Sequence, residues 1–459
     1  MNYVELKADF KLKKVSMLME RVKKIILGII LVSYFVIILD DSIIFTATVK
    51  MASTLDLSSV QIAWVQNSYA LFFGGLLLLG GRVGDMWGRK KIFELGLIIF
   101  GVSSLLIGFS FDGTSLIIFR ALQGAGAAIV APTTLALIMD NFTGYERTKA
   151  ISWYGSIVGI GGAISIVLGG IFAASNWRIG FFINFPICLI IWFLSRKYLQ
   201  NSVTQAGMFD WCGAIVSMIA FFLLIYTIVG SDNFWLTFSL AIIFFIVLYL
   251  IERKHQNPLL PLSLFKNKVR LGAYLGRMGF TASYMSFWFF TPMMLQNYLH
   301  LGSIVTGMAF LPLTVVTFIL SMQVPKLTKK FNNGKVMLFG LTISLIGMFW
   351  LTFYQDGYWI SLSIPMMVLG IGQGLALAPL MSAALYQTNQ KDAGAASGMT
   401  NVTQQLGGAI GISLVTFATS HLSDPLLKFQ SGMKVIFALL VFSFLSALIL
   451  VLPTYLKKR

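Results

Sequence analysis

Long apolar stretches dominate this 459-residue chain and decide its fold class before any other feature does. A helix needs about 20 apolar residues to cross roughly 30 Å of bilayer hydrocarbon. Apolar residues make up 57% of the chain and charged residues only 11%, which excludes a water-soluble enzyme and a disordered chain. The pattern lacks the short alternating segments of a membrane β-barrel, so we predict an all-α integral membrane protein. The sequence contains fourteen candidate spans, at 25–49, 60–80, 92–111, 115–139, 150–174, 180–199, 211–230, 234–251, 271–295, 302–324, 336–354, 358–384, 394–420 and 434–454.

The distribution of basic residues predicts the orientation of these spans. If the N-terminus lies in the cytoplasm, 28 of the 34 Lys and Arg residues fall in cytoplasmic segments and only four in external loops, as the positive-inside rule requires. The basic start of the chain leads into the first apolar run without a small-residue cleavage site. We therefore expect a first transmembrane helix instead of a signal peptide, with both termini cytoplasmic. The net charge of +17 then follows from topology and leaves no patch for nucleic acid.

The spacing of the spans predicts two six-helix bundles with two further helices inserted between them. The short basic loops 81–91 and 324–335 each follow the second helix of a bundle, a weak internal repeat of the kind found in transporter folds. The predicted divisions are a tail at 1–24, a first bundle at 25–199, a linker with the two inserted helices at 200–269, a second bundle at 270–454 and a tail at 455–459.

Several kinds of chemistry have no residues to support them in this sequence. No loop is long enough for a soluble domain, and no GxxxxGK[ST] phosphate loop is present. Cys188 and Cys212 lack metal-ligand spacing, and all three histidines fall in predicted loops. We therefore expect no cofactor, no metal site and no catalytic residues, so the protein is predicted not to be an enzyme. Uphill transport would have to use an ion gradient.

Ionisable side chains inside spans are costly and are functional candidates by default. Asp40 and Asp41 lie in the first span and Arg120 in the fourth, at depths from the external side of about 14 Å for Asp40 and about 8 Å for Arg120. A carboxylate beside a cation in a poorly hydrated cavity can hold a proton and a substrate alternately, so we predict Asp40, Asp41 and Arg120 as proton-coupling residues. Because adjacent helical residues point about 100° apart, only one aspartate is expected to face the cavity. The alternative is an ion pair that only joins the two helices.

The second half of the chain contains no acidic residue between Leu271 and Tyr354, and its later acids fall in predicted loops. Its spans contain aromatic and amide side chains. The face of an aromatic ring attracts a cation, so rings beside a carboxylate suit lipophilic cations. Ordinary packing is the alternative for each of them. Arg277, if it reaches the cavity, would favour anions or zwitterions. The predicted substrate-binding residues are Asp40, Asp41, Tyr284, Trp288, Gln373, Asn401 and Gln404.

Four motifs resemble the major facilitator superfamily, and specifically its fourteen-helix drug:proton antiporters. GRVGDMWGRKK (81–91) resembles the signature loop between helices two and three. RALQGAG (120–126) resembles the motif whose arginine is implicated in proton transfer, and LDDSII (39–44) resembles the helix-one motif, with Asp40 at the acidic position. WRIGFFINFP (177–186) resembles a further signature of this group. The resemblance implies a cytoplasmic latch whose key positions are Gly81, Asp85, Gly88 and Arg89.

The glycine-rich fifth span resembles the antiporter motif of the same family but departs from it at one place. The segment SIVLGG (165–170) keeps the two terminal glycines, while Ser165 and Ile166 replace the usual Gly-Pro. Small residues at this spacing allow close helix packing, which at a moving interface can also form a gate. The candidate residues on this span are Gly155, Gly159, Gly169 and Gly170.

The resemblance implies a proton-coupled multidrug efflux antiporter in a bacterial cytoplasmic membrane. It would exchange protons for lipophilic, often cationic drugs by alternating access. We expect a monomer in the lipid bilayer, with drugs and protons as its only other partners. The alternative is an exporter of one dedicated solute, such as tetracycline, a fatty acid or another metabolite.

Overall fold

The structure, a computed structural model, describes residues 3–200, 210–230, 233–254, 263–355, 357–388 and 393–457, which form helices and short connections. Each of the fourteen predicted spans falls on helical structure, so the predicted all-α fold is confirmed. Among the described residues, nine helical stretches are long and apolar enough to cross a membrane. The helices α2 and α10 are not among these nine, and both bury polar side chains such as Asn67 and Arg277.

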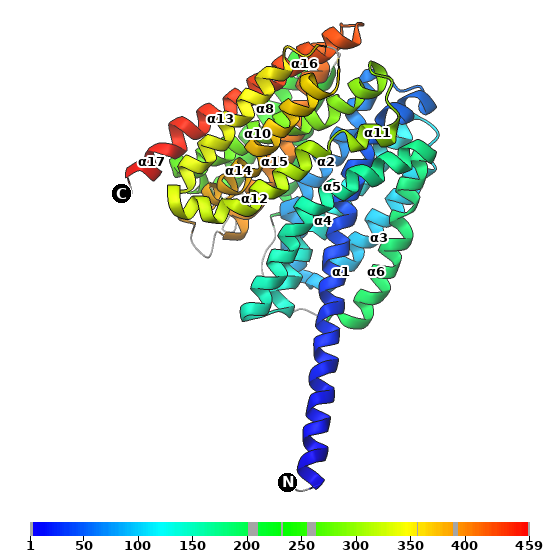
Figure 1. Cartoon of the computed structure of the whole chain (residues 1–459), viewed down its shortest axis with the longest axis vertical. Helices are drawn as coiled ribbons and strands as arrows, with labels where there is room; N and C mark the ends of the chain where they lie inside the picture. Colours follow the sequence, from blue (N-terminus) through cyan, green and yellow to red (C-terminus); the bar gives the residue numbers. More distant parts are fainter. Residues whose placement is uncertain are drawn as a thin grey trace.

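The first half of the chain forms one lobe, which we call the N-lobe (Figure 1). The first helix begins at Tyr3, so the described backbone of the predicted tail is helical and continues into the first span. The N-lobe consists of α1 (Tyr3–Leu55), α2 (Ser59–Trp87), α3 (Arg89–Gly108), α4 (Gly113–Asn141), α5 (Gly144–Phe182) and α6 (Asn184–Tyr198).

The predicted boundary between the fifth and sixth spans lies inside α5, at Asn176. This residue has an extended backbone, with φ −159° and ψ 116°, and its Oδ1 accepts a hydrogen bond from the Arg178 backbone N–H at 3.1 Å. An asparagine that bonds to the backbone two residues ahead competes with helical hydrogen bonding, so the chain turns here. The sixth span is formed by the residues after Asn176 together with α6.

The second half of the chain forms the C-lobe, on the other side of the molecule in Figure 1. Several predicted spans consist of two or three consecutive helical pieces, because short π-helical or irregular turns interrupt them. The C-lobe consists of α10 (Lys268–Asn297), α11 (Ser303–Met308), α12 (Leu311–Phe331), α13 (Asn333–Leu351), η1 (Trp359–Ser363), α14 (Ile364–Ala384), α15 (Ala393–Thr419), α16 (Pro425–Ser446), η3 (Ala447–Val451) and α17 (Leu452–Lys457).

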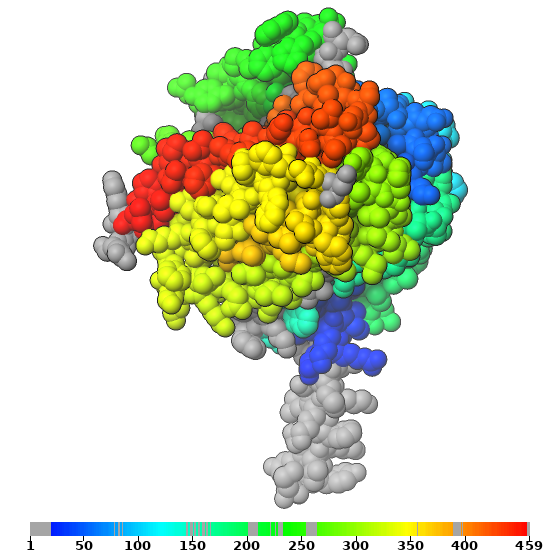
Figure 2. Space-filling model, turned by 45° about the horizontal axis from the view of Figure 1, so that its top comes forward, coloured from blue at the N-terminus to red at the C-terminus, as the bar shows by residue number. Residues whose placement is uncertain are grey.

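The linker between the lobes contains α7 (Trp211–Gly230), α8 (Phe234–Lys254) and the short α9 (Ser263–Lys266). In Figure 2 the green α7–α8 pair lies at the edge of the molecule. The helix α7 packs against α2 and α15, one helix from each lobe, and Trp64 of α2 contacts the rings of Phe222 and Tyr226. The outer face of α8 exposes large apolar side chains such as Trp235 and Ile246, which suits contact with lipid tails. The inserted pair therefore covers one side of the seam between the lobes.

The two ends of the helix bundle differ in charge. We call the end that carries the α2–α3, α4–α5 and α12–α13 connections the basic end, since most Lys and Arg residues lie there, and the other end the opposite end. At the opposite end, Asp112 caps α4 by accepting a hydrogen bond from the Ser115 backbone N–H at 2.7 Å, which holds the pKa of this carboxyl below its usual value. This capping box fixes the start of α4, two turns before Arg120.

Glycines bring α2 and α4 into contact. A methyl group on Gly124 would lie 2.4 Å from the carbonyl oxygen of Tyr69, so only glycine allows this approach. Arg120 lies four residues before Gly124 on α4, and Val65 lies four residues before Tyr69 on α2. The Arg120 Nε donates to the Val65 carbonyl oxygen at 3.3 Å. The close packing thus places the Arg120 guanidinium between the helices.

Candidate polar site between the lobes

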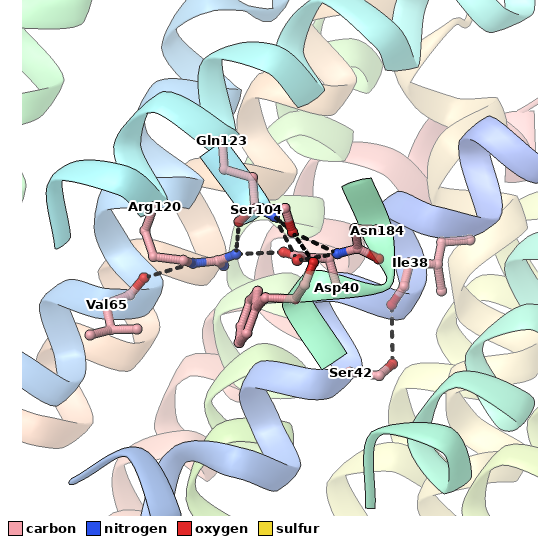
Figure 3. Close-up of polar contacts among 9 residues, drawn as sticks. Ile38, Asp40, Ser42, Val65, Ser104, Arg120, Gln123 and Asn184 are labelled. Atoms are coloured by element: carbon pink, nitrogen blue, oxygen red, sulfur yellow. Dashed lines mark hydrogen bonds and ion pairs between the residues drawn. The ribbon is translucent and has the colours of Figure 1, made fainter. Parts of the chain in front are cut away.

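Asp40 and Arg120 form an ion pair in the interior of the N-lobe, as their predicted depths allowed. The Arg120 Nη1 donates to the Asp40 Oδ2 at 2.5 Å, and both side chains are 0% exposed (Figure 3). The pair joins α1 to α4 across 80 residues of sequence. Two buried charges require each other, since a buried ion without its partner costs several kcal/mol.

A shell of polar side chains completes the hydrogen bonding of Asp40. Its Oδ1 accepts from the Gln123 Nε2 at 2.7 Å and from the Asn184 Nδ2 at 3.2 Å. Both amides also donate to the Ser104 hydroxyl oxygen, at 3.1 and 2.9 Å, and this hydroxyl donates to the Phe181 carbonyl (Figure 3). The network ties α1, α3, α4, α5 and α6 together. Because every oxygen of Asp40 is occupied, this carboxylate is locked inside the N-lobe.

Sequence reasoning missed Ser104, Gln123 and Asn184 as members of this network. Gln123 and Asn184 lie inside the motifs RALQGAG and WRIGFFINFP, so the motifs could have pointed to them. Both side chains are uncharged, and an uncharged residue in a span is not a functional candidate by itself. Their role depends on helix packing, because an amide becomes important only where it meets a buried carboxylate.

The Arg120 guanidinium makes further contacts besides its ion pair with Asp40, and one of its nitrogens has no acceptor among the described residues. Its Nη1 also donates to the Gln123 Oε1 at 2.6 Å, and its plane lies 4.2 Å from the centre of the Tyr69 ring, within cation–π range. The buried Nη2 has no hydrogen-bond partner among the described residues.

Asp41 lies in a different environment from its neighbour. It is partly exposed, and its Oδ1 has no hydrogen-bond partner in the described part of the chain. Tyr34 is seven residues earlier, which places it on the same face of α1 as Asp41. Tyr34 stacks on Tyr154 of α5 with ring centroids 4.3 Å apart. Of the two predicted aspartates, Asp41 is thus the one with an available carboxylate oxygen.

Arg277 is the charged residue buried in the C-lobe. It is 2% exposed, its Nε donates to the Thr400 carbonyl oxygen at 3.1 Å, and its Nη2 donates to the Gln404 Oε1. Both partners belong to α15. The helix α10, which carries Arg277, contacts α1 of the N-lobe.

The other predicted substrate-binding residues occupy different places. Tyr284 is buried within the C-lobe, where its hydroxyl lies 2.9 Å from the Ser344 hydroxyl and from the Leu369 carbonyl oxygen. Gln373 faces Thr317 of α12, and Asn401 is partly exposed on α15. Trp288 is partly buried between the lobes, 6.3 Å from the Phe45 ring and stacked on Phe310. Trp288 thus lies at the seam between the lobes, Gln404 binds Arg277, and Tyr284 lies inside the C-lobe.

The lobes contact each other from the opposite end to the middle of the bundle. The Asn67 Nδ2 donates to the Ser413 hydroxyl at 2.7 Å, and the Gln296 Nε2 donates to the Thr46 carbonyl at 3.0 Å. An apolar cluster that includes Phe45, Leu71, Phe289 and Ile412 surrounds these bonds. The contacts hold the two lobes together at this end.

The predicted latch loop connects α2 to α3 at the basic end. Gly88 has φ 99°, a left-handed backbone that glycine adopts without strain, and it ends α2 and begins α3. Arg89 forms an ion pair with Asp140 of α4, and Lys90 donates to the carbonyls that end α6. Gly81 and Asp85 lie outside the residues whose side chains the structure describes.

The two terminal glycines of the α5 motif allow contacts with two different partners. A methyl group on Gly169 would lie 2.9 Å from the Ser42 carbonyl of α1, and one on Gly170 would lie 2.6 Å from the Ser303 carbonyl of α11. One glycine therefore packs α5 inside the N-lobe and the next packs it against the C-lobe. Gly155 and Gly159 also lie on α5, at positions whose surroundings are outside the description.

We expect Gly170→Ala to reduce transport several-fold, since the added methyl must push α5 and α11 apart. Overpacking of this kind costs about 1–3 kcal/mol, which is paid only in the state where the lobes touch at the opposite end. Gly28→Ala is the matched control, because nothing lies within 4 Å of a methyl at that position. Dye transport by vesicles and the melting temperature of both variants test this. Equal transport by the two variants would show that the approach at Gly170 is dispensable.

Comparisons with known proteins agree with this architecture. The family model of the Major Facilitator Superfamily matches residues 30–412. The puromycin resistance protein of Streptomyces alboniger is 31% identical over 403 residues, which cover 85% of this chain and 80% of that protein. Multidrug resistance protein 3 of Bacillus subtilis is 27% identical and covers 90% of this chain, with 82% of its own length matched.

A solved structure shows the same fold. The bacterial homolog of the human lysosomal transporter Spinster, in an inward-facing and unoccupied conformation, superposes with a TM-score of 0.70. At 15% identity, the match covers 95% of this chain and 98% of that one, and it is evidence for the fold alone. The helical architecture, the match of the family model and the relatives together show that this chain is a multi-pass membrane transporter, not an enzyme, and belongs to the Major Facilitator Superfamily.

Proposed function

We propose that this transporter exports lipophilic compounds, many of them cationic, from a bacterial cytoplasm in exchange for protons. The observation that carries the proposal is the contrast between two adjacent carboxylates on α1. Asp40 is saturated by Arg120, Gln123 and Asn184, whereas Asp41 retains a free oxygen. A free carboxylate in a poorly hydrated place can take either a proton or a cationic substrate, and that competition is the basis of antiport.

In this proposal the basic end faces the cytoplasm, as the positive-inside rule indicates, and both termini lie there. The lobes touch at the opposite end, so substrate would reach Asp41 from the cytoplasmic side. Protonation of Asp41 would then release substrate after the lobes separate at the opposite end. That separation must break the Asn67–Ser413 and Gln296–Thr46 hydrogen bonds. We propose that the monomer carries out this cycle, because one chain supplies both lobes.

The same proposal assigns other residues by their positions. Trp288 and Gln404 would contact the substrate, with Asp41 supplying the charge. The Asp40–Arg120 pair would transmit protonation to the helices that it joins, and the Arg89–Asp140 pair would hold the N-lobe together at the basic end. Tyr284 and Gln373 would support the C-lobe fold beside the substrate path.

Transport into inverted vesicles tests the proposal. We expect uptake of a cationic fluorescent dye when the vesicle interior is acidic and a loss of uptake when an uncoupler removes the pH gradient. The matched control is vesicles that contain the Asp41→Asn variant at equal expression. Dye uptake that is unaffected by the pH gradient would refute proton coupling, and no uptake of any cationic dye would favour the alternative of one dedicated solute.

A further inference from the structure

Arg277 is a buried cation whose charge its own lobe does not balance. No acidic residue occurs between Leu271 and Tyr354. Of the three acids that come later, Asp424 caps α16, and those at 356 and 392 lie outside the described residues. The hydrogen-bond acceptors of Arg277 in the C-lobe are neutral, a backbone carbonyl and an amide oxygen. A buried charge with only neutral partners is costly, and such residues mark ligand paths in membrane proteins.

One nitrogen of the Arg277 guanidinium has no hydrogen-bond acceptor among the described residues. The Nη1 is buried and has no hydrogen-bond acceptor among the described residues, while Nε and Nη2 are bound to α15. The two bonds to α15 fix the plane of the guanidinium, and the helices α10 and α15 contact α1 and α2 of the N-lobe. Arg277 therefore presents a fixed, unused donor at the seam between the lobes.

The unused charges on the two sides of the seam are of opposite sign. Arg120 and Asp40 neutralise each other, whereas Asp41 of the N-lobe and Arg277 of the C-lobe have no ion-pair partner among the described residues, and each keeps an unpaired side-chain atom. The helices that carry these two charges, α1 and α10, contact each other. A ligand between them would meet a negative group at one end and a positive group at the other.

We propose that Arg277 binds an anionic group of the substrate, so that the preferred substrates are lipophilic zwitterions with their positive group at Asp41. This inference rests on the proposed function and names its substrate class. Guanidinium donors recognise carboxylates strongly because both partners are charged, and an unsatisfied buried donor gains most from such a partner. A purely cationic compound would leave the Nη1 of Arg277 unpaired.

A matched pair of dyes tests the proposal by fluorescence anisotropy with purified protein in detergent. Rhodamine B carries a carboxylate and a delocalised cation, and its ethyl ester carries only the cation on the same ring system. We expect the wild-type protein to bind rhodamine B more tightly than the ester. Arg277→Gln should lower the affinity for rhodamine B by about 10- to 100-fold, the effect of one charged hydrogen bond, and leave the ester unchanged within about threefold.

Three further variants distinguish recognition of the carboxylate by Arg277 from a general loss of dye affinity. Arg277→Lys keeps the charge and is expected to retain part of the preference for the acid. Arg178→Gln is the arginine control, since Arg178 donates to the carbonyls of Gly108 and Ser110 within the N-lobe. Asp41→Asn should weaken both dyes alike, because both carry the cation. If Arg277→Gln weakens both dyes equally, or neither, or if the wild-type protein prefers the ester, the proposal is wrong. These binding measurements need no pH gradient, so their failure is distinguishable from a failure of proton coupling in vesicles.

Discussion

Replacing Arg120 with leucine is expected to abolish transport and to lower the free energy of unfolding by about 3–5 kcal/mol. The substitution leaves Asp40 buried at 0% exposure without its counter-ion, and the amides of Gln123 and Asn184 cannot replace a full charge. The measurement is thermal and denaturant unfolding in detergent, beside dye transport in vesicles. Arg196→Leu is the control. Arg196 forms an ion pair with Glu94 at 3.8 Å, but its side chain is 63% exposed, so losing this pair should lower the free energy of unfolding by about 1 kcal/mol or less.

The double variant Asp40→Asn/Arg120→Gln distinguishes a structural role of the pair from a role in transport. Removing both charges avoids an uncompensated buried ion, so stability should recover most of what Arg120→Leu loses. Transport should not recover if the pair transmits protonation to the helices that it joins. A double variant that is stable and fully active would reduce the pair to a device for holding α1 against α4. A double variant as unstable as Arg120→Leu would show that hydrogen-bond geometry outweighs charge in this network.

Asp41→Asn is expected to eliminate proton-driven transport while leaving the fold intact. Its Oδ1 has no hydrogen-bond partner among the described residues, so the amide loses no bond there. An amide neither exchanges a proton nor attracts a cation, and we expect the affinity for a cationic dye to fall about 10- to 100-fold. Dye binding in detergent and dye-induced proton release from the purified protein measure the two effects separately.

Asp40→Asn is the natural comparison for this variant, because the two aspartates are neighbours in sequence. We expect it to lower the melting temperature, since Arg120 then lacks its counter-ion, and to weaken dye binding much less than Asp41→Asn does. The reverse pattern, with binding lost at Asp40 and preserved at Asp41, would place the exchange site inside the Asp40 network and contradict the assignment to Asp41.

Much of the architecture could be predicted from the sequence because membrane spans obey a one-dimensional rule. About 20 apolar residues must cross the hydrocarbon and must satisfy their backbone hydrogen bonds internally, so each span is a helix. Local chemistry also sets boundaries, as at Gly88, where a left-handed backbone separates α2 from α3. The break at Asn176, between the predicted spans 150–174 and 180–199, has a local cause as well, because this asparagine side chain bonds to the backbone two residues ahead.

The candidate site divides into what the sequence determined by itself and what only tertiary structure decided. The sequence determined that Asp40, Asp41 and Arg120 lie away from the cytoplasmic ends of the first-half spans, and that the spans of the second half contain Arg277 and no acid. Burying charge in a membrane is too costly to be accidental. Tertiary structure decided which carboxylate is saturated and which is available. Adjacent residues on α1 point about 100° apart, and whether either direction meets Arg120 and two amides depends on residues that are 80 to 144 positions away in the chain. That choice is made by helix packing, at glycines such as Gly124, where the distance between two backbones decides which side chains can reach each other.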